Sequence, residues 1–206
     1  MSQIKVTYLG HMGSDITVVN AARVSFGKRS GMICVDHQLG KYELEEADAK
    51  LITYLAKHKH KSPFNHVSLT FHVKAPIFVA RQLQKHEYMP WNEISRRYVD
   101  DEPEFYTPVW RGRSKDKKQG SEGPIEIKSN PTNDYALQTY KNLLADGVAP
   151  EQARVVLPQS LMTEWYWSGF LYAWAKMCSL RCKPDSQEET RQVADQIDEK
   201  LSLIHI

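Results

Sequence analysis

The chain has 206 residues, of which 41% are hydrophobic and 25% charged, and this is enough to bury one sizeable core. Its 27 basic and 25 acidic side chains leave a net charge of +2, so the protein as a whole has no strong attraction to nucleic acid or to a membrane. No apolar run approaches the ~20 residues that span a bilayer. We therefore expect a soluble protein with neither a membrane nor a nucleic acid as partner.

The three cysteines, Cys34, Cys178 and Cys182, are too few and too irregularly spaced for a secreted disulfide framework. The N-terminal residues also lack the charged and apolar regions of a signal peptide. Both observations predict a cytoplasmic location. Cys178 and Cys182 lie four residues apart on an expected helix and can share a face. Without two more ligands, we expect buried structural thiols there rather than a metal site.

The first half of the chain predicts two strands and three helices. The expected elements are a strand over 4–10, a helix that begins after Ser14 or Asp15, a helix over 45–58, a turn at 62–66, a strand over 67–73 and a helix from Pro76 to about His86. Strict alternation of apolar and polar residues indicates that the 67–73 strand is half buried. Val79, Ala80 and Leu83 form the apolar face of the helix that follows it.

The second half begins with residues 99–130, which lose periodicity and include a charged, glycine-containing surface loop at 111–124. The elements expected after it are a helix over 130–147, a short helix near Pro150, a strand from Leu161 to Ser168, and helices near 170–180 and 186–203. We predict an α+β fold with helices around a modest central antiparallel or mixed sheet.

The segment KHEYMPWNEISRRY (85–98) has the density of polar groups that is typical of a binding loop. Arg96 and Arg97 carry the planar fork that fits phosphate, Glu93 could accept an N–H of a polar heterocycle, and Ser95 could donate or accept. The alternative is a solvated surface in which Glu93 and Arg97 form an ordinary i, i+4 pair and Ser95 caps a helix.

Arg154 and Arg181 stand among apolar residues, and a mostly buried arginine requires an anion or a structural carboxylate partner. The histidines of KHKHKSPFNH (57–66), together with His72 and His86, match no common zinc spacing. We therefore predict no metal site, and we expect these histidines to be hydrogen-bonding groups at a cofactor site.

The stretch HVSLTFHVKAPIFVARQ followed by NEISRRY resembles the core of the flavin-dependent thymidylate synthases. NAARVSF (20–26), KHKHKSPFNH (57–66), EQARVVLP (151–158) and SLRCKPDSQEE (179–189) have the order and spacing of that family. The resemblance covers most of the chain outside 27–45 and 108–130. It implies one domain over 1–206 with a variable surface loop at about 108–130.

The resemblance implies synthesis of dTMP from dUMP, with 5,10-methylenetetrahydrofolate as carbon donor and FAD relaying hydride from NADPH. It also implies a homotetramer whose active sites lie between subunits. The residues implied around dUMP are Gln82, Lys85, Glu93, Ser95, Arg96, Arg97, Arg154 and Arg181. Those implied around FAD are Ser25, His60, Ser62, Lys85, His86, Glu87, Glu93 and Lys176.

In this scheme Arg181 assists ionisation of the uracil N3, Arg97 and Arg154 hold the phosphate, and Ser95 positions the base. None of the cysteines stands where the unrelated classical thymidylate synthases carry their catalytic thiol.

The chain departs from the family where Arg-His-Arg is replaced by Lys85-His86-Glu87, because Glu87 reverses a charge that would face the flavin diphosphate. This implies weaker or differently held FAD. Phe170, Tyr172 and Lys176 replace further flavin contacts, and Lys176 is a candidate to compensate. The alternative function is a uridylate-binding module that has lost flavin and redox activity. Binding of single-stranded nucleic acid through aromatics and arginines is a weaker alternative, because the basic groups lie around a compact site and the overall charge is near neutral.

Overall fold

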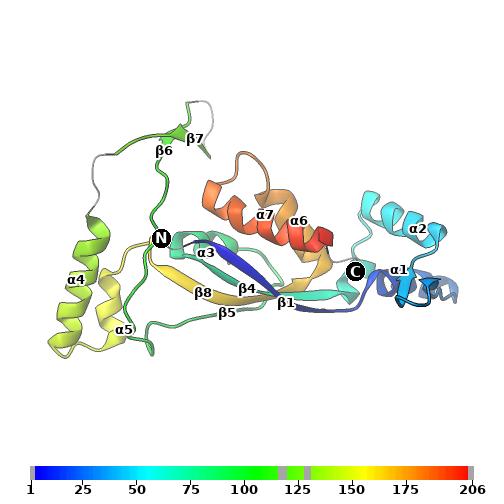
Figure 1. The fold of residues 1–206 in the computed structure, drawn as a ribbon, viewed down its shortest axis with the longest axis horizontal. Helices are drawn as coiled ribbons and strands as arrows, with labels where there is room; N and C mark the ends of the chain where they lie inside the picture. The colour runs from blue at the N-terminus through cyan, green and yellow to red at the C-terminus, as the bar shows by residue number, and fades with distance from the viewer. Residues whose placement is uncertain (1–2, 116–119, 128–130, 204–206) are drawn as a thin grey trace.

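The computed structural model describes residues 3–115, 120–127 and 131–203, and its centre is a four-stranded antiparallel sheet of order β1-β4-β8-β5. The strands are β1 (Lys5–Met12), β4 (Ser68–Pro76), β5 (Trp91–Glu93) and β8 (Met162–Phe170). Two small hairpins lie outside this sheet, β2 (Ile33–Asp36) with β3 (Lys41–Glu43), and β6 (Arg111–Arg113) with β7 (Ser121–Pro124). Figure 1 shows the sheet at the middle of an elongated molecule.

Helices surround this sheet, so the predicted α+β class is confirmed. They are α1 (Asp15–Arg23), α2 (Glu46–Lys57), α3 (Ile77–Leu83), α4 (Thr132–Ala145), α5 (Pro150–Ala153), α6 (Leu171–Arg181) and α7 (Glu188–Leu203), with short 3-10 turns η1 (Val24–Phe26), η2 (Ser62–His66) and η3 (Arg154–Val156). In Figure 1, α3, α6 and α7 cover one face of the sheet, α1 and α2 form one end of the molecule, and α4 and α5 form the other. No helix among the described residues is long and apolar enough to cross a membrane.

The two central strands carry the core because their side chains alternate strictly between the two faces of the sheet. Phe71 pairs with Trp167 and Val73 with Trp165, and all four are buried under the helices. Trp174 of α6 packs edge-on against both Phe71 and Trp167, with ring centroids 4.9 and 4.8 Å away. Burial of large aromatic rings from three elements fixes α6 over the sheet.

The opposite face of the same strands is polar. Thr70 and Ser168 share a hydrogen bond of 2.9 Å between their hydroxyls. His72 Nε2 lies 3.0 Å from Glu164 Oε2, and Lys74 Nζ lies 3.7 Å from Oε1 of the same carboxylate. The predicted alternation of the two strands is therefore confirmed on both faces.

Three expectations from the sequence were wrong in detail. The helix from Pro76 ends at Leu83 instead of His86, and Tyr88, in the turn that follows, has a left-handed φ of 60°. The segment that we expected to be only a loop at 111–124 contains the β6–β7 hairpin, although residues 116–119 lie outside the described part. Short strands were also missed at β2, β3 and β5.

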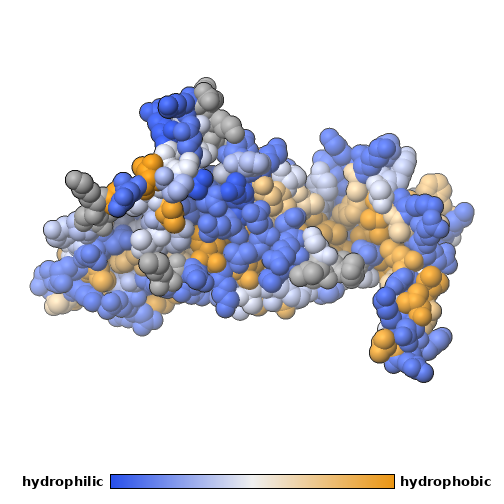
Figure 2. Space-filling model, turned by 45° about the horizontal axis from the view of Figure 1, so that its top comes forward, coloured by the Kyte–Doolittle hydropathy of each residue, from blue (hydrophilic) through white to orange (hydrophobic). Residues whose placement is uncertain are grey.

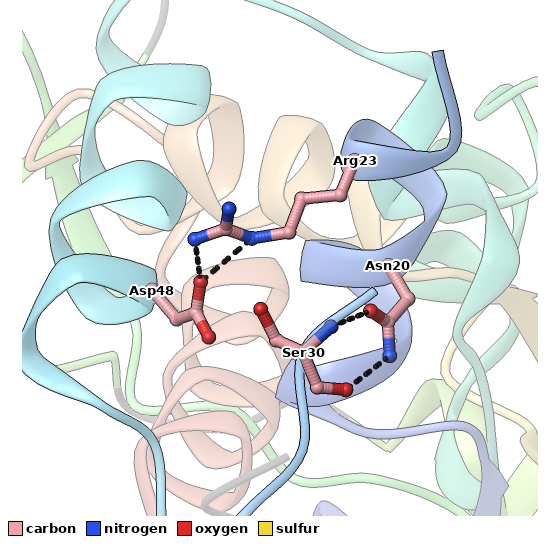
Figure 3. A network of polar contacts seen from close by, with 4 residues as sticks. All are labelled: Asn20, Arg23, Ser30 and Asp48. Atoms are coloured by element: carbon pink, nitrogen blue, oxygen red, sulfur yellow. Dashed lines mark hydrogen bonds and ion pairs between the residues drawn. The ribbon is translucent and has the colours of Figure 1, made fainter. Parts of the chain in front are cut away.

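A buried ion pair joins the two helices at the end of the molecule formed by α1 and α2 (Figure 3). Arg23 of α1 donates from Nε to Asp48 Oδ1 of α2 at 2.8 Å, and the Asp48 carboxylate is fully buried. Beside it, Asn20 and Ser30 form two hydrogen bonds. Asn20 Nδ2 donates to the Ser30 carbonyl at 3.1 Å, and the Ser30 backbone N–H donates to Asn20 Oδ1 at 2.8 Å. These contacts fix the NAARVSF segment relative to α2.

We predict that Arg23→Met lowers the free energy of unfolding by about 3 kcal/mol, because it leaves a buried carboxylate without its cation. Denaturant unfolding measures this. As a control on α2, the helix that carries Asp48, Lys50→Met removes the exposed partner of Glu46 and should cost no more than about 0.5 kcal/mol. Equal effects of the two substitutions would contradict a structural role for the Arg23–Asp48 pair.

Candidate functional site

A cavity with a volume of about 820 Å³ lies beside α3 and the junction of α6 and α7. Gln82 and Arg181, both predicted around dUMP, line it. Its other walls come from residues 106–111, the β6–β7 hairpin, the start of α4 and residues 158–160. The structure therefore brings together two predicted substrate residues that are separated by almost a hundred positions in sequence.

Gln82 offers an unused acceptor at this cavity. Its Oε1 is buried and has no hydrogen-bond partner among the described residues. A buried amide oxygen without a partner costs free energy, so such a group is expected to be satisfied by something absent from a single bare chain. A ligand with an N–H group, such as a pyrimidine base, would satisfy it.

Arg181 ends α6 and is half-buried, and its Nε donates to His86 Nε2 at 3.1 Å. An acceptor nitrogen is available only when the imidazole is neutral and its proton is on Nδ1. Burial, together with the smaller effects of the Arg181 and Lys176 charges, lowers the pKa of His86 from 6.5 to about 4. His86 is therefore neutral at physiological pH. Burial also lowers the pKa of Arg181 from its ordinary value.

Glu93 is held on the edge strand β5. Its Oε1 accepts from Thr163 Oγ1 at 2.7 Å and its Oε2 accepts from Trp91 Nε1 at 3.1 Å. The Trp91 ring stacks on Trp165 with centroids 4.3 Å apart, so the core itself positions this carboxylate. The alternative in which Glu93 pairs with Arg97 is not what the structure shows.

The loop after β5 is organised by its own side chains. Arg97 donates from both its backbone N–H and its Nε to Ser95 Oγ, at 3.3 and 3.1 Å, and its guanidinium lies 4.9 Å from the Tyr98 ring centroid. Arg96 donates to the carbonyl of Asp101. Ser95, Arg96 and Arg97 do not line the cavity of Gln82 and Arg181 within this single chain.

Arg154 was expected to be mostly buried, and this was wrong for the single chain. It is exposed at the start of η3, and its Nε donates to the carbonyl of Glu151 at 3.1 Å. The apolar neighbours that suggested burial divide between core and surface, because Ala153 is buried whereas Val155 is exposed. Among the described residues, the Arg154 side chain has this one hydrogen bond, so its exposed guanidinium can accept an anion but is not buried in a way that requires one.

The residues predicted around FAD fall into two groups. Lys176 lies close enough to His86 for its charge to act on the imidazole, with Lys85 and Glu87 exposed on the adjoining turn. Ser25, His60 and Ser62 are exposed near the α1–α2 end of the molecule. A contact between Lys61 and the Tyr172 ring, 5.5 Å from Nζ to centroid, links the segment of His60 and Ser62 to α6.

The site partly fits a flavin dinucleotide. Lys176 and Arg181 supply cations beside His86, where a diphosphate requires positive charge. The exposed carboxylate of Glu87 opposes that charge from the neighbouring position. The positive charge of Lys176 could therefore offset the negative charge that Glu87 introduces.

Several cavity residues were missed by the sequence analysis. Ser186 lines the cavity with its Oγ buried and unpartnered among the described residues. Tyr106 lines it as well, and burial followed by the charges of Glu189 and Glu188 raises the pKa of its phenol. The motif SLRCKPDSQEE was the only available signal for Ser186, and no local pattern marked Tyr106.

We predict that His86 titrates near pH 4 in the folded protein and that Lys176→Gln moves its pKa upward, toward 6.5, because a repelling cation is removed. NMR titration of the imidazole measures this, with Lys41→Gln on the distant β3 as control. The unfolded chain takes up this proton more readily, so His86 should lower stability as the pH falls from about 6.5 toward 4 and have no effect above that range. A pKa near 6.5 in the unmodified protein would contradict the buried Arg181–His86 arrangement.

Comparison with known proteins gives consistent matches over nearly the whole chain. The family described as "Thymidylate synthase complementing protein" matches residues 7–205. A flavin-dependent thymidylate synthase of Thermus thermophilus is 41% identical over 200 residues, covering 94% of this chain and 70% of that protein. Another from Thermotoga neapolitana is 40% identical over 183 residues, covering 89% of this chain and 78% of that protein.

A solved structure agrees with these sequence matches. The UMP/dUMP methylase PolB from Streptomyces cacaoi, bound with 5-Br dUMP, has a TM-score of 0.80 to this chain at 30% identity. The match covers 98% of this chain and 92% of that one. With the family model, the sequence matches and the fold in agreement, the chain belongs to the family of flavin-dependent thymidylate synthases.

Proposed function

We propose that this protein converts dUMP to dTMP with FAD bound, taking the carbon from 5,10-methylenetetrahydrofolate and the reducing equivalents from NADPH. Membership of the family supports the reaction and the flavin. The observation that carries the assignment of residues is the shared cavity of Gln82 and Arg181. We further propose a single domain over the whole chain, and a cytoplasmic location.

The uracil ring would lie between Gln82 and Arg181. Among the described residues, the amide oxygen of Gln82 has no partner, and Arg181 Nε donates to His86. The two terminal nitrogens of the guanidinium would then face a substrate. A fixed cation near N3 favours the N3 anion and so increases electron density at C5, the carbon that is alkylated. Bound FAD would supply the hydride chemistry, while the chain orients the reactants.

We propose that the complete site needs more than one subunit. Ser95, Arg97 and Arg154 lie away from the cavity of Gln82 and Arg181 in one chain, although all are expected around the same nucleotide. Large apolar side chains are also exposed near α1 and on the β2–β3 hairpin, including Val24, Phe26, Ile33 and Val35. Figure 2 shows hydrophobic surface gathered toward this end of the molecule. Such surface is typical of an interface between subunits, and a homotetramer would cover it.

We predict that Arg181→Ala lowers the turnover of dUMP by roughly a hundredfold, with a smaller effect on dUMP affinity, because the cation acts mainly on the developing anion. Tritium release from C5 of labelled dUMP, with FAD, NADPH and the folate donor present, measures turnover. The exposed Lys183→Ala, two positions away, is the matched control and should keep full turnover. Near-full turnover of Arg181→Ala would overturn its assigned role.

Arg181→Ala, combined with a second variant, also tests whether the active sites are shared between subunits. Arg97→Ala should also be inactive, since it would lose phosphate binding. If Arg97 and Arg181 of one site come from different subunits, dissociating and mixing the two inactive variants should restore part of the activity. Failure to recover any activity from verified mixed oligomers would contradict the shared site.

We predict that Glu87→Arg tightens FAD binding by roughly tenfold at low salt, because it replaces a repelling carboxylate by a cation near the diphosphate. Quenching of flavin fluorescence during titration of the protein measures this affinity, and Lys176→Gln should weaken it. Glu43→Arg on the distant β3 makes the same charge change and should leave it unaltered. If the unmodified protein fails to bind FAD even at saturating concentration, the flavin-dependent reaction is wrong for this chain and a uridylate-binding module takes its place.

A further inference from the structure

The C-terminal helices bring three metal-ligating side chains together outside the cavity described above. Cys178 lies on α6, Cys182 caps the end of that helix one turn later, and Asp198 projects from α7. Their ligand atoms, two thiol sulfurs and one carboxylate oxygen, all lie within 4.8 Å of one another. Figure 1 shows the two helices side by side over the sheet.

The spacing of these atoms is close to that of a tetrahedral zinc site. Zinc–sulfur bonds of about 2.3 Å at tetrahedral angles place two sulfurs about 3.8 Å apart. Small rotations of the side chains would therefore suffice to close the group around one ion. An i, i+4 pair presents both thiols to the same side of α6, and the neighbouring helix supplies the third ligand.

The surroundings suit a site that closes around a metal. Cys178 is buried and Cys182 partly buried, whereas Asp198 is exposed and leaves a path of entry from solvent. A second α7 carboxylate, Asp195, is hydrogen-bonded to the Cys182 thiol. Two thiols and a nearby pair of carboxylates attract a borderline-soft divalent cation such as Zn²⁺ in preference to Mg²⁺ or Ca²⁺, which select all-oxygen sites.

We propose that Cys178, Cys182 and Asp198 form a zinc site that clamps α6 to α7, with water as the fourth ligand. Binding replaces the two thiol protons, which pass to the buffer, and involves no oxidation or reduction. None of its three ligands lines the cavity of Gln82 and Arg181. The sequence alone argued against a metal here because two thiols lacked further ligands, and the packing of α7 against α6 supplies the missing carboxylate.

The proposed zinc site lies next to Arg181 in the chain, so a bound ion would affect the candidate active site. Cys182 directly follows Arg181, which is hydrogen-bonded to His86. An ion bound to Cys182 would hold the end of α6 in place and so limit the movement of the Arg181 backbone. The clamp would therefore act on stability and on the rigidity of that helix end.

Titration of the reduced, chelator-treated full-length protein with Co²⁺ tests the proposal, because Co²⁺ in a thiolate site gives a charge-transfer band and visible absorption. We expect one equivalent of Co²⁺ per chain, displacement by Zn²⁺, and a rise in Tm when Zn²⁺ is added. Asp198→Asn, an exposed position that should not impair folding, should weaken binding at least tenfold.

Three cysteine variants complete the experiment. Cys178→Ser and Cys182→Ser should each abolish the charge-transfer band, whereas Cys34→Ser, on the separate β2–β3 hairpin, should retain it. Circular dichroism checks that each variant is folded. Absence of a thiolate band in the unmodified protein, or Co²⁺ affinity that Asp198→Asn leaves unchanged, would overturn the site. Because the readout is metal binding without flavin or nucleotide, it stands apart from the test of the proposed reaction.

Discussion

The antiparallel pairing of β4 with β8 is the constraint on which the other elements depend. The ladder runs from Ser68 opposite Phe170 to Pro76 opposite Met162, so the two strands end at opposite ends of the sheet. Each strand is followed at once by a helix, α3 after Pro76 and α6 after Phe170. Both helices turn back over the same face (Figure 1), and this is why His86, just beyond α3, meets Arg181 at the end of α6.

The same pairing also positions the carboxylate of Glu93, which the sequence analysis expected at the substrate site. β5 adds to the edge of β8 with Glu93 opposite Trp165 and Trp91 opposite Trp167. Stacking of Trp91 on Trp165 adds to these backbone bonds, and the hydroxyl of Thr163 holds the carboxylate itself. The aromatic packing that stabilises the core therefore also fixes the position of Glu93, because the buried tryptophans hold the strand that carries it.

The sequence could predict the features that depend on interactions between residues close together in the chain, but not those that depend on distant segments. The alternation in β4 and β8 and the amphipathic faces of the helices are local signals, and the structure confirmed them. β5 has only three residues and owes its pairing to a partner strand about seventy positions away, so no local pattern could reveal it. The shortened α3 has a similar cause, since Tyr88 adopts a left-handed conformation that a helical period does not encode.

The candidate site shows the same limit more sharply. Resemblance to a family could name Gln82, His86 and Arg181, but not that Gln82 and Arg181 share one cavity or that His86 accepts from Arg181. The expectation that Arg154 is buried was wrong, because its apolar neighbours in sequence are not all in the core: Ala153 is buried and Val155 is exposed. Hydrogen bonds between distant segments depend on how the helices pack, and a single sequence does not contain that information.

The choice of a histidine rather than a carboxylate as the partner of Arg181 has an electrostatic meaning. A carboxylate would orient the guanidinium and also neutralise it, so little positive charge would remain for a substrate anion. Burial and the nearby cations hold the pKa of His86 at about 4, so the imidazole accepts a hydrogen bond without adding a charge of its own. Arg181 is half-buried, and a poorly solvated cation interacts more strongly with a developing anion than one in water does. A neutral partner therefore combines a fixed direction with an undiminished charge, which is the combination that the proposed stabilisation of a uracil anion would use.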